Sequence, residues 1–192
     1  MMLMKKKRSL AYTLAALIVT GILYGIWAGF LSTPHEANHV RFHPVPDNTT
    51  SVQPTTVHLY FSDKSNLYLS AENRELTFPG DPVESAKQIV QALIDGPRNG
   101  LMRTLPPCTK LRALFLYEDG TAFVDFSNAL SENHPGGSES ELMTLYSIVN
   151  SLILNIDDIH SVKILIEGHD SMTLAGHMDL RFPFNANMRL IR

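Results

Sequence analysis

Residues 111–126, LRALFLYEDGTAFVDF, hold the pattern that decides the fold. Two runs rich in aromatic and aliphatic residues, 111–117 and 121–126, flank the pair Asp119-Gly120. An Asp-Gly pair suits the positive φ angles of a tight turn, and apolar runs on both sides of it are typical of a β-hairpin. The stretch therefore predicts two antiparallel strands.

The residues that follow the hairpin predict a long amphipathic helix and one more strand. Five apolar residues recur at the spacing of one helix face, namely Leu142, Leu145, Val149, Leu152 and Ile156. Before them, GGSESE at 136–141 provides a flexible lead-in, in which Ser138 and Glu141 have the spacing of a capping box. SVKILIE at 161–167 predicts the further strand.

A second helix and a first hairpin are predicted on the amino-terminal side. DPVE at 81–84 is a typical helix start, and Gly-Pro at 96–97 ends that helix. Upstream, TTVHLYFS at 55–62 and NLYLSAENREL at 66–76 predict two strands. The order strand, strand, helix, strand, strand, helix, strand indicates an α+β domain at 56–192, with a mixed or antiparallel sheet and two helices packed on one face.

The length, charge and cysteine content of the chain limit the classes of protein to which it can belong. The chain has 192 residues, of which 44% are hydrophobic, so it has room for one domain with a proper core and something smaller. The net charge is -3, but KKKR at 5–8 supplies four positive charges, and the rest of the chain carries 12 minus 19, or -7. Such an acidic remainder argues against nucleic-acid binding. Cys108 is the single cysteine, so no internal disulfide is possible.

Residues 9–31 predict a transmembrane helix. The run LAYTLAALIVTGILYGIWAGFL at 10–31 is almost wholly apolar. As a helix it would extend roughly 33 Å, enough for a hydrocarbon core of about 30 Å. A cleaved signal peptide is the competing interpretation, but its apolar region is typically only ~7–15 residues long. The basic cluster predicts that residues 1–8 are cytoplasmic and that the domain lies outside the cytoplasm, in the periplasm or on the outer surface.

Residues 32–55 predict an extended, proline-rich linker. Within it, HEANH at 35–39 fits H-E-x-x-H, the spacing by which zinc peptidases bind their metal. A catalytic zinc site also needs a third ligand and a cavity walled by a folded domain. Extended zincin signatures place glycine and histidine where this chain has Phe42 and Val45. No catalytic zinc site or other cofactor is predicted, while adventitious metal binding by the linker histidines stays open.

Six motifs, in order along residues 57–184, carry a resemblance to a known family. They are V-x-L-Y-F at 57–61, A-L-I-x-G-P at 92–97, PPCTKLR at 106–112, VDFS at 124–127, the helix at 139–154, and LIEGHDSMTLAGHMDL at 165–180. Together they resemble the GerMN (sporulation and spore germination) family, from which Cys108 departs where glycine is common and Ser151 where threonine is favoured. The resemblance implies a fold similar to ring-building motifs, in an anchored, non-cytoplasmic module for binding or assembly.

The candidate binding residues lie in two predicted loops, one after the first helix and one in the last hairpin. They are Gly96, Pro97, Arg98, Arg103, His169, Asp170, His177 and Asp179. The first loop is where we expect contact with a partner. The histidines and aspartates of the second loop either line a polar pocket or are ordinary solvated turn residues.

The aromatic residues of the first hairpin, at 60–61 and 68, leave two interpretations open. They indicate either an ordinary buried strand pair, which packing favours, or an exposed sheet edge to which a partner or another copy adds a strand.

We therefore expect a non-enzymatic, single-pass membrane protein whose outer domain binds or scaffolds partners, in sporulation, germination or cell-envelope assembly. Its partner would be an envelope protein or another copy of the chain. The alternative is a receptor for a small ligand or cell-wall fragment. An envelope hydrolase would need clustered acids, or a nucleophile with a base, and no catalytic residue is predicted. An apolar pocket with convergent polar groups would favour the receptor, whereas an exposed edge or flat surface would favour assembly.

Overall fold

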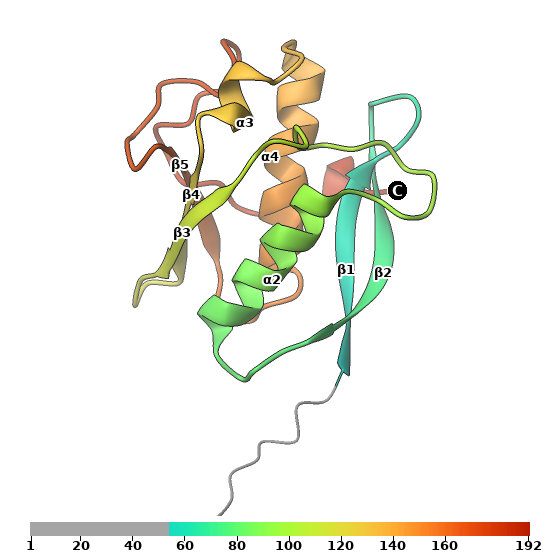
Figure 1. The fold of residues 1–192 in the computed structure, drawn as a ribbon, viewed down its shortest axis with the longest axis vertical. Helices are drawn as coiled ribbons and strands as arrows, with labels where there is room; N and C mark the ends of the chain where they lie inside the picture. Colours follow the sequence, from blue (N-terminus) through green and yellow to red (C-terminus); the bar gives the residue numbers. More distant parts are fainter. Residues whose placement is uncertain (1–53) are drawn as a thin grey trace, which may run out of the picture. The chain divides into compact units, whose positions relative to one another are not determined.

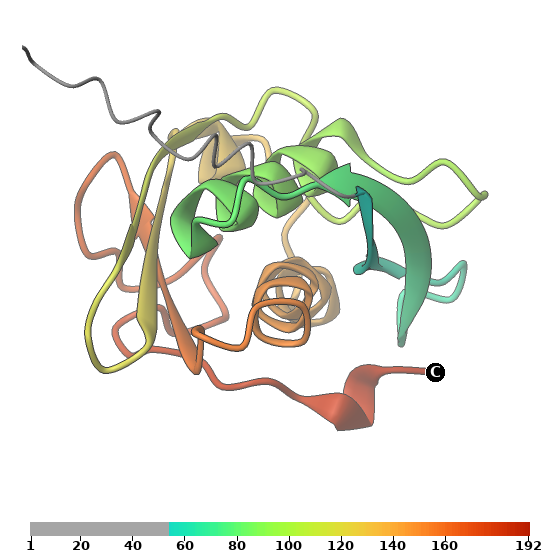
Figure 2. The same cartoon turned by 90° about the horizontal axis from the view of Figure 1, so that it is seen from below.

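In the computed structural model, which describes residues 54–192, the longest helix lies between two β-sheets (Figures 1 and 2). The predicted cytoplasmic tail, the transmembrane helix at 9–31 and the HEANH motif fall outside the described residues. Among residues 54–192, no helix combines the length and the apolar character needed to cross a membrane.

The first sheet is the hairpin of β1 (Pro54–Ser62) and β2 (Leu69–Thr77), which pair antiparallel and confirm the first predicted strand pair. The side chains of β1 alternate, so that Val57, Leu59 and Phe61 enter the core.

The second sheet contains β3 (Leu111–Leu116), β4 (Thr121–Phe126) and β5 (Ser161–Ile166) in the order β3-β4-β5. Strands β3 and β4 form the hairpin that the opening stretch predicts, and β5 runs parallel to β4, so the sheet is mixed. Gly120 has φ +80 in the hairpin turn, and a Cβ there would lie 2.5 Å from the His160 ring. The turn therefore requires glycine at this position.

Helix α2 (Pro82–Asp95) begins and ends where the sequence predicts. The Asp81 side chain accepts a hydrogen bond from the Val83 N–H at 3.0 Å, and Gly96 closes the helix with φ +90. Within these bounds, one face of the helix places a row of apolar side chains, including Ile89 and Leu93, in the core.

Helix α4 (Ser138–Ile153) has the predicted span, but the predicted capping box is wrong. Gly137 is the N-cap residue, and no side chain caps the helix. The Glu141 carboxylate is buried and instead accepts hydrogen bonds from the backbone N–H groups of His177 and Met178. Two short helices, α3 (Ala129–Glu132) and η1 (Met188–Leu190), complete the elements of the described chain.

The prediction of one sheet with both helices on one face is wrong, because the strands form two sheets. Helix α4 contacts β1 on one side and β5 on the other, while α2 packs against β3, β1 and α4 (Figure 2). Buried residues around most of α4, among them Met143, Leu145 and Ile148, match this position. A helix that is buried on several sides lacks the single apolar stripe of a surface helix.

Polar side chains of α4 and of Asn155, just after the helix, close the outer edge of β1. The Ser151 hydroxyl accepts a hydrogen bond from the Tyr60 N–H at 2.9 Å, and the Ser147 hydroxyl donates to the Tyr60 carbonyl at 2.6 Å. One turn further on, Asn155 bonds to both backbone groups of His58 at 2.8 Å. The helix thus takes the place of a neighbouring strand, and the β1 edge is not open to strand addition.

Candidate functional site

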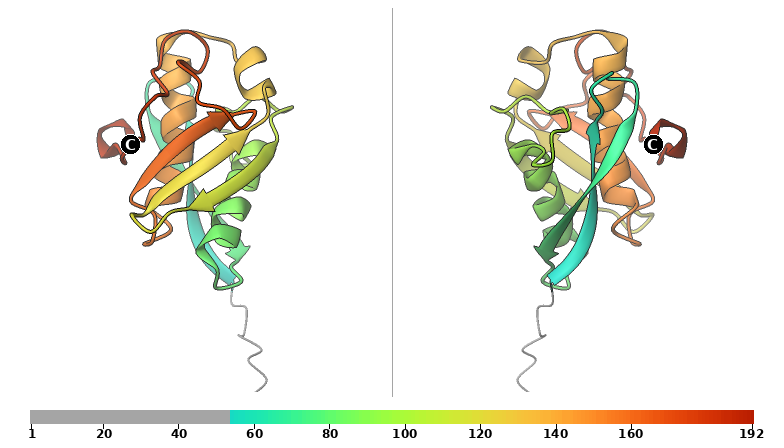
Figure 3. Two further views of the ribbon diagram at one scale, coloured as in Figure 1. Left: turned by 90° about the vertical axis from the view of Figure 1, so that its left-hand side faces the viewer. Right: turned by 90° about the vertical axis from the view of Figure 1, so that its right-hand side faces the viewer.

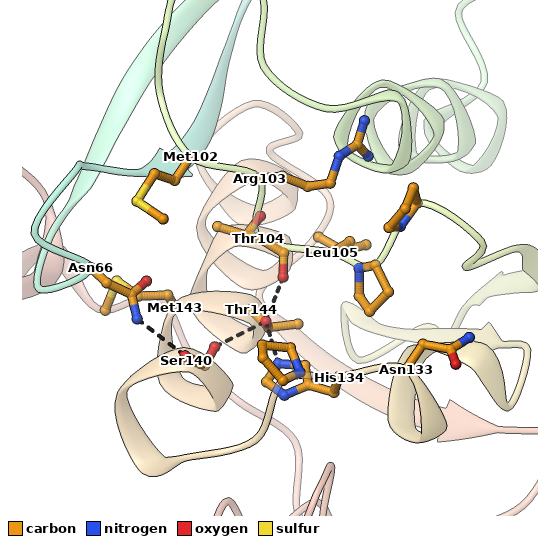
Figure 4. A pocket seen from close by; sticks show the side chains of 13 residues that line it. Asn66, Met102, Arg103, Thr104, Leu105, Asn133, His134, Ser140, Met143 and Thr144 are labelled. Carbon is orange, nitrogen blue, oxygen red and sulfur yellow. Dashed lines mark hydrogen bonds between the residues drawn. The ribbon is translucent and has the colours of Figure 1, made fainter.

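A groove of about 420 Å³ lies beside the amino-terminal half of α4 (Figure 4). Its walls come from segments that are distant in the sequence: residues 102–107, residues 133–135 and the first turns of α4. Asn66, from the loop between β1 and β2, lies at one end and donates a hydrogen bond to the Ser140 hydroxyl at 3.2 Å. The groove combines apolar walls, such as Met102 and Leu105, with a few polar groups.

His134 is the central polar residue of the groove, and its hydrogen bonds assign its tautomer. The Gly136 N–H donates to Nδ1 at 3.0 Å, so Nδ1 carries no proton. Nε2 therefore carries the proton and donates it to the Thr144 hydroxyl at 2.9 Å. The Thr144 hydroxyl in turn donates to the Thr104 carbonyl at 2.5 Å. This chain joins three walls of the groove through a neutral imidazole (Figure 4).

Burial lowers the pKa of His134, and the negative charge of Glu141 opposes that shift only in part. The folded protein therefore binds a proton at His134 less readily than the unfolded chain does. The contribution of neutral His134 to the free energy of unfolding is complete above pH about 6.5, the pKa of histidine in the unfolded chain. It is lost as the pH falls through the lower pKa that His134 has in the folded protein.

We expect the His134→Gln variant to lose less stability than the natural protein when the pH falls below about 6.5, because glutamine takes up no proton. The measurement is the free energy of unfolding of the full chain at neutral and mildly acidic pH, by urea titration. His160→Gln, at an exposed histidine, is the matched control. An identical pH dependence in the natural protein and His134→Gln would contradict the assignment.

The first predicted binding loop closes the carboxyl end of α2. Arg103 donates hydrogen bonds to the carbonyls of Ile94 and Asp95, and Arg74 donates to that of Gly96. A Cβ at Gly96 would lie 2.5 Å from the Arg103 guanidinium, and the φ of +90 at this position favours glycine. The loop beyond is half-buried at Pro97 and exposed at Arg98. Of the eight candidate residues, Arg103 is the one that also lines the groove.

The structure gives the four candidates of the second loop separate partners. His177 Nδ1 lies 2.8 Å from the Glu141 carboxylate, and His169 Nδ1 lies 2.7 Å from the Glu167 carbonyl. Asp170 pairs with Lys163 at 2.7 Å. Asp179 pairs with Arg181 at 2.8 Å, and that bond lowers the pKa of Asp179 to about 2. Between residues 54 and 192, no group of three or more His, Cys, Asp or Glu side chains is arranged to hold a metal ion.

Sequence reasoning did not single out His134, Thr144 or Asn66 as groove residues. His134 precedes a Pro-Gly-Gly run that indicates a flexible loop, and the other two residues stand alone in a loop and in a helix. The groove depends on tertiary contacts for which no local motif exists.

A second candidate surface is an apolar patch on the outer side of the β3-β4-β5 sheet. We call it the aromatic face and define it as Phe115, Tyr117, Phe123 and Leu165. Phe115 is 59% exposed and Tyr117 is 64% exposed. Phe115 lies opposite Phe123 in the strand register, and the rings of Tyr117 and Phe123 are 5.1 Å apart. A shallow hollow of about 490 Å³ lies among them. Exposed apolar side chains that lie together in this way form a candidate interaction surface.

Comparison with known proteins identifies the family. The profile of the Germane family, described as sporulation and spore germination, matches residues 58–171. The chain belongs to the Germane (GerMN) family. The matched range confirms the predicted resemblance and contains both the groove and the aromatic face.

Three solved structures resemble the Germane domain of this chain. A candidate lipoprotein from Clostridium perfringens is 25% identical, with a TM-score of 0.51 over 70% of this chain and 89% of that one. The tandem GerMN domains of the sporulation protein GerM from Bacillus subtilis are 25% identical, with a TM-score of 0.56 over 71% of this chain. The match spans 47% of that tandem chain. The first GerMN domain of GerM is 24% identical, with a TM-score of 0.52 over 70% and 98% of the two chains. No curated protein matches.

Proposed function

We propose that this Germane-family protein binds another protein at the cell envelope through the aromatic face and acts as a scaffold without a catalytic step. The exposure of Phe115 and Tyr117 on a surface already continuous with Phe123 and Leu165 carries the proposal. Burying a large apolar side chain against a partner contributes about 1.5–3 kcal/mol, so two such residues provide a substantial driving force. The arrangement fits assembly better than an enclosed ligand site.

The envelope location rests on the predicted transmembrane helix at 9–31 and is supported by the resemblance to a candidate lipoprotein. A membrane anchor would confine the domain to a thin layer and raise its effective concentration for envelope partners. The sporulation protein GerM, whose tandem domains are similar to this chain, supports a role in sporulation, germination or a related envelope assembly.

Photo-crosslinking of the full chain in the cells that make it tests this function. We expect a benzophenone amino acid in place of Phe115 to give a discrete protein adduct, which Tyr117→Ser weakens several-fold because the partner loses apolar contact. The matched control replaces Met188, which has the same 59% exposure on another part of the domain. Recovery of the Phe115 variant only as free protein, or with the same diffuse adducts as the Met188 variant, would refute the proposal.

The groove supports a second candidate function, a receptor for a small ligand or cell-wall fragment. Its volume of about 420 Å³ and its neutral His134 among apolar walls favour this role. Saturable binding of soluble muropeptides to the full chain that is lost in Met102→Glu and retained in Phe115→Ser would select the receptor over the scaffold.

A further inference from the structure

Strand β3 has an open edge. It pairs with β4 on one side only (Figure 3, left). Phe115 lies opposite Phe123, and the Tyr117 N–H donates to the Thr121 carbonyl at 3.0 Å, so these residues direct their backbone groups toward β4. Because alternate residues point in opposite directions, the N–H and C=O groups of Leu114 and Leu116 point away from it. Within residues 54–192, no loop or side chain bonds to these groups.

The other sheet edges of the described domain are closed or polar. Side chains of α4 occupy the β1 edge, and Phe184 forms two backbone hydrogen bonds with Val162 at the β5 edge. The β2 edge bonds to Arg192 at its start and then presents Asn73 and Glu75 to solvent. Polar and charged residues protect an edge against unwanted pairing. The β3 edge has a bulge and the charged Arg112 at its start, whereas the exposed Phe115 and Tyr117 stand beside its second half.

The sequence of β3 complements itself when two copies run antiparallel about Phe115. Phe115 then lies opposite Phe115 of the second copy, and Leu114 opposite Leu116, so their free backbone groups satisfy one another. In the same register Tyr117, which directly follows the strand, covers the small Ala113. Facing aromatic pairs stabilise neighbouring strands.

Moving the two-fold axis to Leu114 removes this agreement. Phe115 would then face Ala113 instead of a second aromatic ring. Of these two registers, the one about Phe115 therefore has the better side-chain pairs.

We infer that the partner of the aromatic face is a second copy of this chain, joined through antiparallel pairing of the two β3 edges. The inference rests on the proposed function, for which it names the partner. The pairing produces one continuous sheet in the order β5-β4-β3-β3-β4-β5. It also unites the two aromatic faces, because Phe115 and Tyr117 stand on the same side of the sheet in both copies.

Disulfide crosslinking of the full chain in membranes tests the pairing and its register. Cys108 is first replaced by serine, and Phe115→Cys is then introduced and oxidised mildly. The Phe115 pair is a non-hydrogen-bonded one, with Cα atoms about 4.5 Å apart, which a disulfide accommodates. We expect the dimer to form at least tenfold faster than with Met188→Cys, an equally exposed position, or Asn73→Cys on the β2 edge.

Two further variants fix the register. Chains with Ala113→Cys and chains with Tyr117→Cys, mixed in one membrane, are expected to crosslink to each other. Ala113→Cys alone is expected to fail, because two copies of it would lie about 13 Å apart along the strands. Equal rates for Phe115→Cys and both controls would overturn the pairing, and efficient crosslinking of Ala113→Cys alone would overturn the register.

The two proposals fail in different ways. A Phe115 photo-adduct with a different protein, together with no self-crosslinking of Phe115→Cys, overturns the β3 pairing and leaves the scaffold function standing. The absence of both the adduct and the disulfide overturns both proposals.

Discussion

Replacing Arg74 with methionine is expected to lower the free energy of unfolding by about 3–5 kcal/mol, the usual cost of removing one partner from a buried ion pair. Glu72 is 2% exposed and Arg74 is 5% exposed, and the two side chains are paired on the inner face of β2. Arg74 also donates to the carbonyl of Ala92 at 3.0 Å and to that of Gly96 at 2.6 Å. Methionine preserves much of the volume but leaves the Glu72 charge and both carbonyls without this donor.

The same pair connects β2 to the loop after α2. The second carboxylate oxygen of Glu72 accepts hydrogen bonds from the N–H groups of Arg98 at 2.7 Å and Asn99 at 2.9 Å. Burial alone would raise the pKa of Glu72, but the bonds from Arg74, Arg98 and Asn99 outweigh it and lower the pKa below its usual value. Glu72 therefore stays charged, and the loss of its cation is felt at neutral pH.

The effect of Arg74→Met is measured by urea unfolding of the full chain, with resistance to a short protease pulse as the readout of the folded fraction. Lys87→Met is the matched control, because Lys87 pairs with Glu84 on the exposed surface of α2 and should contribute less than about 0.5 kcal/mol. Adding Glu72→Gln to Arg74→Met removes the unpaired negative charge of Glu72. The double variant should therefore recover part of the free energy of unfolding that Arg74→Met loses. Equal losses in Arg74→Met and Lys87→Met would show that the buried pair does not hold the domain together.

The local elements were predictable because their signals are local. Helix α2 has its cap at Asp81 and its stop at Gly96, and the hairpin β3-β4 has its Asp-Gly turn, all within a few residues of chain. The division into two sheets was not predictable in this way. It depends on Ser147, Ser151 and Asn155, which close the β1 edge but stand in the sequence like ordinary polar positions of a helix.

The candidate surfaces were predictable only in part, for a similar reason. Strand periodicity places Phe115 and Tyr117 on one side of β3, but which side faces solvent depends on where the helices pack. Gly96 was correctly expected at a helix end, whereas the approach of Arg103 to Gly96 arises from tertiary structure. His134 gains its groove partners, Thr144 and Thr104, only when three segments meet.

Glu141→Ala is expected to lower the free energy of unfolding by about 3 kcal/mol, because it removes a buried, charged acceptor and leaves the donors of His177 and Met178 without it. Glu141 is fully buried in the first turns of α4. Its carboxylate accepts hydrogen bonds from the Met178 N–H at 2.8 Å, the His177 N–H at 3.1 Å and the His177 ring at 2.8 Å. It thereby attaches the closing segment, residues 172–180, to the helix, and that segment places Leu174 and Leu180 in the core.

The effect of Glu141 should depend on pH. Burial alone would raise its pKa, but the hydrogen bonds from Met178 and His177 outweigh burial and lower the pKa. A lowered carboxylate pKa stabilises the fold fully above the unfolded value of 4.5, and this stabilisation is lost as the pH falls through the folded pKa. Glu141→Gln keeps an acceptor oxygen without the charge, so it should cost less than Glu141→Ala and remove this acid dependence.

Hydrogen exchange of the Met178 amide reports the attachment directly. Protection of this amide should fall in Glu141→Gln, fall further in Glu141→Ala, and stay unchanged in Glu139→Gln, at an exposed position of the same turn. Because the amide donates to the Glu141 carboxylate and no helix or strand includes Met178, its protection depends on that bond more than on the stability of a ladder. Unchanged protection in both Glu141 variants would mean that packing of Leu174 and Leu180 alone holds the closing segment in place.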